Sequence, residues 1–101
     1  MPTFNASVSV TSGLTDAGIK IDGQEIVLGP SGDGGFAGIG QINSDASPIP
    51  FEFRATGPAG FPATLKVVLT PAAGGAASTF SKKYVIPDSL LLIANDQIKP
   101  S

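Results

Sequence analysis

The stretch from Ile49 to Thr56 constrains the fold of this chain most, because its residues alternate strictly between two kinds. Every second position is apolar (Ile49, Phe51, Phe53 and Ala55), and the residues between them are Pro, Glu, Arg and Thr. Successive side chains of a β-strand leave opposite faces, so a period of two is what a half-buried strand requires. A helix would scatter the same apolar residues around its circumference. The pattern therefore predicts a strand with one face in a hydrophobic core.

A second alternating run follows, from Thr64 to Thr70, with Leu65, Val67 and Leu69 on one face. The segment Gly57–Pro62 lies between the two runs and holds two glycines and two prolines. Glycine and proline at this density cannot continue a strand. We therefore expect either a wide hairpin loop or a crossover from one sheet to another.

Two further segments in the first half of the chain predict strands. Thr3–Thr11 alternates, and Gly18–Leu28 surrounds the dipeptide Asp22-Gly23, which is a strong hairpin signal. The apolar members of that hairpin are Ile19, Ile21, Ile26 and Leu28.

Phe36–Ile42 also predicts a strand, and it carries glycines at positions 38 and 40. Glycines inside a strand indicate a bulge, a bend or the close approach of another group. The preceding segment, Gly29–Gly35, is expected to be a flexible loop.

The last third of the chain leaves two local questions open. In Ser78–Ile86, Lys82 falls in phase with Phe80 and Tyr84. Either a bulge at Lys82–Lys83 resets the phase, which we favour, or Lys82 reaches past the core to solvent. Leu90–Ala94 is a continuous apolar run, which suits a strand covered on both faces; the alternative is a short helix capped by Asp88.

With 101 residues the chain is long enough for one domain and one core, so residues 1–101 are expected to form a single unit. Short strands, frequent turn signals and at most one helical turn predict an all-β fold. We expect a small antiparallel β-sandwich of about six to eight strands, immunoglobulin-like or jelly-roll-like, with a small β-barrel as the alternative.

Composition excludes several classes of function. Histidine and cysteine are absent, which removes the usual general base and the ordinary zinc, copper or haem site. A net charge of −2 without blocks gives no reason to expect nucleic acid or an anionic membrane as a partner. We expect neither a membrane-inserted segment nor a signal peptide, and the compartment stays unassigned.

The sequence also argues against an enzyme. The only glutamates, Glu25 and Glu52, point outward on their predicted strands, and no serine is followed by lysine at the spacing Ser-x-x-Lys. The glycine-rich segment 32–35 lacks the strand–loop–helix context that a nucleotide-binding loop needs.

The remaining site candidates are loop residues. Asp33 and Asp96 are the candidate metal ligands, for Ca²⁺, which takes six to eight oxygens. The candidate binding residues are Phe61, Asp33 and Asp45, with Phe61 as the one aromatic expected to be exposed. No Asp-x-Asp-x-Asp pattern concentrates the acids, and aspartate is also a routine turn residue.

The first functional hypothesis is a non-catalytic module that acts through its surfaces, as a structural or assembly subunit or as a protein–protein adaptor. Its partner would be another protein or a second copy, paired through strand edges, with Thr3–Thr11 and Ile49–Thr56 as the candidate edges. The alternative is a ligand-binding module in which the Gly/Asp loops hold a carbohydrate or small molecule with the help of Ca²⁺.

Overall fold

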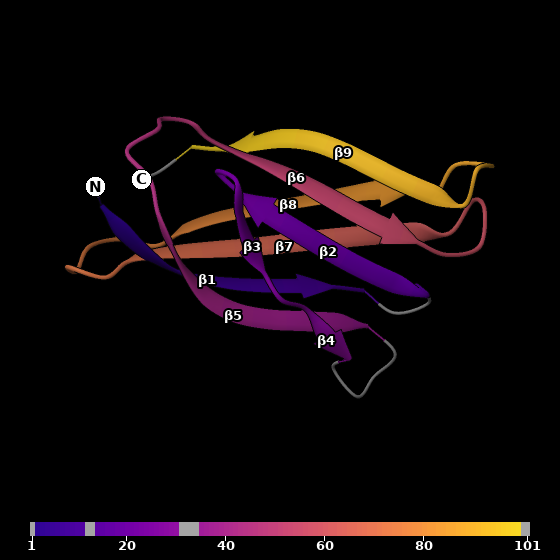
Figure 1. The fold of residues 1–101 in the computed structure, drawn as a ribbon, viewed down its shortest axis with the longest axis horizontal. Helices are drawn as coiled ribbons and strands as arrows, with labels where there is room; N and C mark the ends of the chain where they lie inside the picture. The colour runs from indigo at the N-terminus through magenta and orange to yellow at the C-terminus, as the bar shows by residue number, and fades with distance from the viewer. Residues whose placement is uncertain (1, 12–13, 31–34, 100–101) are drawn as a thin grey trace.

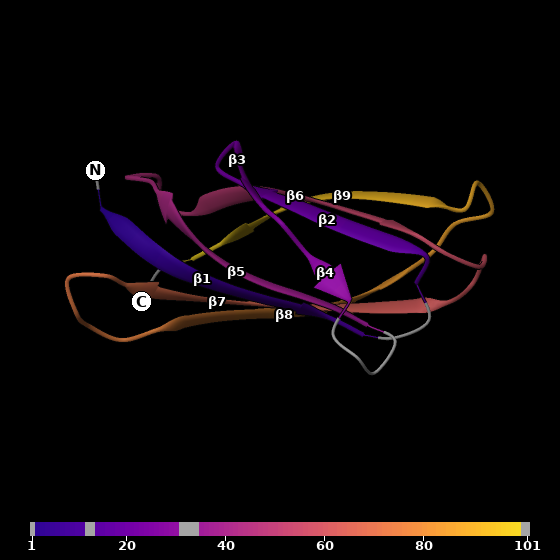
Figure 2. The same ribbon diagram turned by 60° about the horizontal axis from the view of Figure 1, so that its bottom comes forward.

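The computed structural model describes residues 2–11, 14–30 and 35–99. They form two antiparallel sheets packed face to face, which confirms the predicted β-sandwich; the sheets do not join into a closed barrel (Figures 1 and 2). One sheet has the order β4–β5–β1–β7–β8, with β1 (Thr3–Val10), β4 (Gly29–Pro30), β5 (Phe36–Asn43), β7 (Pro62–Pro71) and β8 (Ser78–Val85). The other has the order β3–β2–β6–β9, with β2 (Asp16–Ile21), β3 (Gln24–Ile26), β6 (Ile49–Thr56) and β9 (Leu91–Ile98).

The core lies between the two sheets and is built from the alternate residues that the sequence marks as apolar. Its largest fully buried side chains include Phe53 from β6 and Leu65 from β7. Aromatic rings meet across the layers: the ring centroids of Phe51 and Phe80 are 5.0 Å apart at 73°, and those of Phe53 and Tyr84 are 5.8 Å apart. The edge-to-face arrangement of Phe51 and Phe80 adds to the free energy gained by burial alone.

The Gly/Pro segment between β6 and β7 is a crossover and not a hairpin, because β6 and β7 belong to different sheets. Its end is fixed by backbone hydrogen bonds to the β8–β9 connection. Gly60 donates to the Ile86 carbonyl at 2.8 Å, and Ile86 donates to the Phe61 carbonyl at 2.9 Å. The two connections therefore support each other at one end of the sandwich.

The β2–β3 hairpin confirms the Asp22-Gly23 signal. Both residues have positive φ (49° and 77°), as a two-residue turn between twisted strands requires. The segment that follows, Val27–Pro30, crosses from one sheet to the other.

This crossing explains the two glycines of β5. A Cβ at Gly38 would collide with the Val27 carbonyl, and one at Gly40 would lie 3.0 Å from Ile26 Cδ1. Of the three alternatives that the glycines leave open, the close approach of another group is the one observed. Contrary to the expected loop, Gly29–Pro30 pairs with β5 as the short strand β4; residues 31–34 of that loop lie outside the described residues.

Both strands that the sequence suggests as sheet edges are interior. β1 lies between β5 and β7, and β6 lies between β2 and β9. Pro50 is tolerated in β6 because its carbonyl accepts a hydrogen bond from Asp22 N at 2.7 Å, where β2 has already ended. N–H and C=O of one residue point to the same neighbour in an antiparallel strand, so the missing N–H costs only the last bond of that ladder.

The favoured bulge at Lys82–Lys83 is also wrong. The β7–β8 register runs without a break from Pro62↔Val85 to Leu69↔Ser78, so Lys82 shares the inward face of Phe80 and Tyr84. The alternative, in which Lys82 reaches past the core to solvent, is the one observed. The expected strand at Leu90–Ala94 is observed from Leu91 onward as the start of β9. The expectation that it is covered on both faces is wrong, because Leu91 and Ile93 are 41% and 48% exposed.

Candidate functional site

The two long margins of the sandwich are built differently. On one side the β3–β4 connection crosses between the layers, and the Gln24 side chain bonds both the N–H and the C=O of Asn43, at 2.8 and 2.7 Å. On the other side β8 and β9, each eight residues long, are the last strands of their sheets (Figure 1). We call this side the open margin, defined by β8 and β9.

Asp96 is the centre of the polar contacts that span the open margin. Its Oδ2 accepts from Lys82 Nζ at 3.3 Å and from Tyr84 OH at 3.4 Å, so it links β9 to β8. Its Oδ1 accepts from the backbone N–H of Gln97 at 3.0 Å. Lys82 Nζ also lies 5.4 Å from the centroid of the Tyr84 ring, within cation–π range.

The protonation states in this cluster follow from those contacts. The hydrogen bond from the Gln97 N–H, with help from Lys82, holds the pKa of the Asp96 carboxyl below its usual value. Burial, and then the charge of Asp96, raise the pKa of Tyr84 to about 12. At neutral pH the cluster therefore contains a carboxylate and a neutral phenol that donates to it.

The backbone of β9 shows which groups lack a neighbour. Leu90 O accepts from Gly57 N at 3.3 Å on the β6 side. The N–H and C=O groups of even-numbered residues of β9 therefore point to β6, and those of odd-numbered residues point away from the sheet. The Gln97 N–H is one of these outward groups and is capped by Asp96; the Leu91 carbonyl is another and accepts from Ser89 Oγ at 3.3 Å. Between these two caps, no group from the described part of the chain bonds to the outward N–H and C=O groups of β9.

Apolar side chains accompany the bare edge. Leu91 and Ile93 lie on the outer face of β9 and are 41% and 48% exposed. A sheet edge with apolar side chains and no charge among them is the type that pairs with another strand. The facing edge, β8, carries Lys82 and Lys83, which are typical guards of an edge strand.

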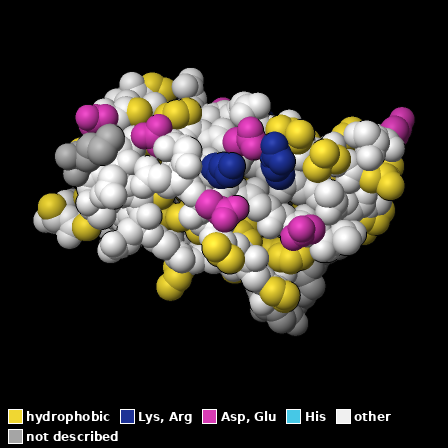
Figure 3. Space-filling model, in the orientation of Figure 1, with side chains coloured by type: hydrophobic (Ala, Val, Ile, Leu, Met, Phe, Trp, Pro, Cys, Tyr) yellow, Lys and Arg dark blue, Asp and Glu magenta, His cyan; other side chains and the backbone are white. Residues whose placement is uncertain are grey.

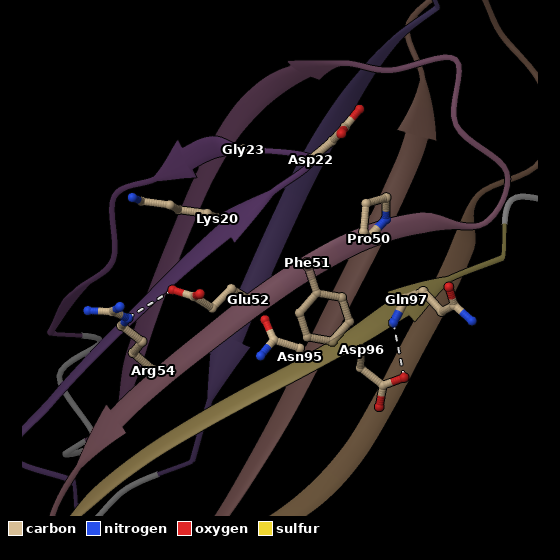
Figure 4. A pocket seen from close by; sticks show the side chains of 10 residues that line it. All are labelled: Lys20, Asp22, Gly23, Pro50, Phe51, Glu52, Arg54, Asn95, Asp96 and Gln97. Atoms are coloured by element: carbon tan, nitrogen blue, oxygen red, sulfur yellow. Dashed lines mark hydrogen bonds and ion pairs between the residues drawn. The ribbon is translucent and has the colours of Figure 1, made fainter.

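A shallow polar hollow lies beside this edge, on the outer face of the four-stranded sheet. It encloses about 660 Å³, and Figure 4 shows the residues that line it: Lys20, Asp22, Gly23, Pro50, Phe51, Glu52, Arg54, Asn95, Asp96 and Gln97. Basic and acidic side chains alternate across the middle of this face (Figure 3). Arg54 Nε pairs with Glu52 Oε1 at 2.8 Å, and Lys20 is directly opposite Glu52 on the neighbouring strand.

The hollow can make hydrogen bonds but offers no nucleophile with a base. Arg54 is paired with Glu52, Asp96 is paired with Lys82 outside the hollow, and the carboxylate of Asp22 accepts from Ser44 Oγ at 2.6 Å. Lys20 and the amides of Asn95 and Gln97 have no side-chain partner among the described residues, and the two amides suit an uncharged polar solute. Within residues 2–11, 14–30 and 35–99, no three acidic residues lie close enough together to hold a metal ion.

The structure separates the site residues that the sequence suggests. Asp45 follows β5 and Phe61 precedes β7, so they lie at opposite ends of β6, about 25 Å apart for eight residues of strand. Contrary to the expected loop position, Asp96 lies within strand β9, opposite Phe51, on the open margin. Asp33 lies outside the described residues. Phe61 is exposed as expected, at 40%.

Sequence reasoning missed the cluster of Lys82, Tyr84 and Asp96. The signal that could have found it is the inward phase of Lys82, since a lysine on an inward face needs a nearby anion or an open margin.

Comparison with protein-family models, with curated proteins and with solved structures finds no match to this chain. None of the elements in the described ranges is a helix long and apolar enough to cross a membrane.

Proposed function

We propose that this chain is a non-catalytic β-sandwich module that acts through its surfaces, as an assembly subunit or a protein–protein adaptor. The observation that carries the proposal is the open margin, where two full-length strands end their sheets on the same side. Unpaired backbone groups in a row bind another strand by main-chain hydrogen bonds, and the side chains beside them select the partner. Leu91 and Ile93 supply the apolar contact there.

Sedimentation velocity over a wide range of protein concentration tests this proposal. The wild-type chain is expected to show an average mass that rises with concentration, and Ile93→Lys is expected to keep it monomeric, because a charge on the edge opposes pairing. Ile39→Lys is the matched control: Ile39 is more exposed, at 83%, but lies on the outer face of β5, away from the open margin. A wild-type chain that stays monomeric at every concentration and binds no protein partner would contradict the proposal.

A second candidate function is the binding of a small polar ligand, such as a sugar, in the hollow of Figure 4. The amides of Asn95 and Gln97 beside the ion pair of Arg54 and Glu52 favour it. Titration calorimetry with a panel of glycans, with Ca²⁺ and with EDTA, tests this candidate. Heat that is lost in Asn95→Ala and retained in Asn5→Ala, a control on the other sheet, would support it; no heat with any glycan would count against it.

A further inference from the structure

We infer that β9 pairs antiparallel with β9 of a second copy, about a twofold axis at Ala94, so that the two four-stranded sheets become one. This inference rests on the proposed function and names its partner. It follows from the order of bare and capped groups along the β9 edge.

The groups of β9 without a neighbour are symmetric about Ala94. They are the N–H of Leu91, the N–H and C=O of Ile93, the N–H and C=O of Asn95, and the C=O of Gln97. The Leu91 carbonyl and the Gln97 N–H are left out, because Ser89 caps the first and Asp96 caps the second. In an antiparallel pair of two such strands, the free N–H groups of each copy therefore lie opposite free carbonyls of the other.

One register satisfies all of these groups. With Leu91 opposite Gln97 of the second copy, the Leu91 N–H meets the Gln97 carbonyl, and Ile93 and Asn95 exchange both of their bonds. Three N–H donors and three carbonyls from each copy then make six hydrogen bonds, and both caps stay in place. Shifting the register by one residue would place each outward N–H and C=O opposite a residue whose own groups point to β6, so shifts are restricted to even steps.

The side chains fit the same register. Ala94 meets Ala94 at the twofold axis, at the closely spaced type of pair, where two small side chains fit without a clash. Asp96 lies opposite Leu92 and not opposite the second Asp96. On the outer face the two Ile93 side chains are diagonal neighbours, which provides apolar contact at the centre of the pair.

The other long edge opposes the same arrangement. The outward groups of β8 belong to its odd-numbered residues, because Ile86 bonds to Phe61 on the β7 side. A twofold axis at Lys82 would place Lys82 directly opposite Lys82 of the second copy, and like charges directly opposite each other are destabilising. A twofold axis at Ser81 would make the two Lys82 side chains diagonal neighbours, still within reach of each other. The open margin is therefore selective: β9 accepts its copy and β8 does not.

A single cysteine tests the register, since the chain has none of its own. Ala94→Cys is expected to form a disulfide-linked dimer under mild oxidation, because the Cα atoms of such a pair are about 4.5 Å apart, within disulfide range. The control is Ser7→Cys, on the outer face of the interior strand β1, which is more exposed than Ala94 and is expected to stay uncrosslinked.

A proline pair tests the edge without a cysteine. Asn95→Pro removes one outward N–H of β9 from each copy, so two of the six bonds are lost, and the dimer dissociation constant should rise at least about tenfold. Ser81→Pro removes an outward N–H from β8 and should leave the constant unchanged.

The outcomes separate the inference from the proposed function. If sedimentation shows association but Ala94→Cys does not cross-link, or if Ser81→Pro weakens association as Asn95→Pro does, then β9 self-pairing is wrong and the surface-acting module stands. Extended polymers in place of a dimer would equally overturn the twofold pairing. If the wild-type chain does not associate and Ala94→Cys does not cross-link, the pairing is overturned, and the result also counts against assembly from copies of this chain.

Discussion

Gly38 lies where the chain crosses from one sheet to the other, and its missing side chain makes room for that crossing. A Cβ at this position would collide with the backbone carbonyl of Val27, which cannot rotate away as a side chain can. Gly38→Ala should therefore lower the free energy of unfolding by about 1–3 kcal/mol, the usual cost of overpacking. Urea denaturation measures it. Gly18→Ala is the control, because nothing lies within 4 Å of its Cβ position; an equal loss in both variants would contradict the explanation.

Tyr84 offers a second measurement on a single residue, because it is the only tyrosine in the chain. Burial and then Asp96 raise its pKa to about 12, from 10.0. The folded state therefore holds the phenol proton more tightly than the unfolded state, so this stabilisation is complete below pH 10 and is lost as the pH rises from 10 towards 12. The ultraviolet absorbance of the phenolate should titrate near pH 12 in the folded protein and near 10 in denaturant. Asp96→Asn should lower the folded value, and an unshifted folded titration would contradict the contacts.

At the scale of single strands, the direction of each backbone group in β9 has a measurable consequence. The backbone N–H of Ala94 points to β6, so Ala94→Pro removes a ladder hydrogen bond with Phe53. The free energy of unfolding should fall by about 1–3 kcal/mol or more, because the Phe53 carbonyl is left unpaired. The backbone N–H of Asn95 points away from the sheet, so Asn95→Pro should leave the stability of the monomer close to that of the wild type. Denaturation at a protein concentration low enough to keep the chain monomeric measures both. Equal losses would show that the assignment of inward and outward groups is wrong.

The strands themselves could be predicted from the sequence, and their neighbours could not. Alternation, as in Ile49–Thr56, reports that one face of a strand is buried, and β6 has the expected buried face. It carries no information about whether a strand lies on each side, which is why β6 appeared to be an edge. Pro50 also favours an edge position, because proline has no N–H for a ladder. Its missing N–H falls at the end of β2, and the sequence does not reveal this because it depends on the register with another strand.

The candidate site escaped prediction for a related reason. Asp96 meets Lys82 and Tyr84 only because β8 and β9 end their respective sheets on the same side. That juxtaposition depends on strand order across the whole sandwich. The phase of Lys82 was visible in the sequence, but its partner anion was not.

At the scale of the whole molecule, the two sheets should unfold together, because neither has a core of its own. Phe53 of β6 is fully buried, and its ring lies 5.8 Å from the ring of Tyr84 in the opposite layer. Phe53→Ala should cost roughly 3–5 kcal/mol. Because a domain of this size has about 5–15 kcal/mol in total, the variant should melt at a much lower temperature or be unfolded at 25 °C.

Phe61→Ala is the matched control for this change, because Phe61 is the same residue type at 40% exposure in the β6–β7 crossover. The free energy of unfolding lost in Phe61→Ala should be well below that lost in Phe53→Ala, since surface substitutions usually change it by no more than about 0.5 kcal/mol. Circular dichroism and tyrosine fluorescence should give one coincident transition for the wild type and for Phe61→Ala. Two separate transitions would mean that the four-stranded and five-stranded sheets do not depend on a common core, and that the rings of Phe53 and Tyr84 do not couple them.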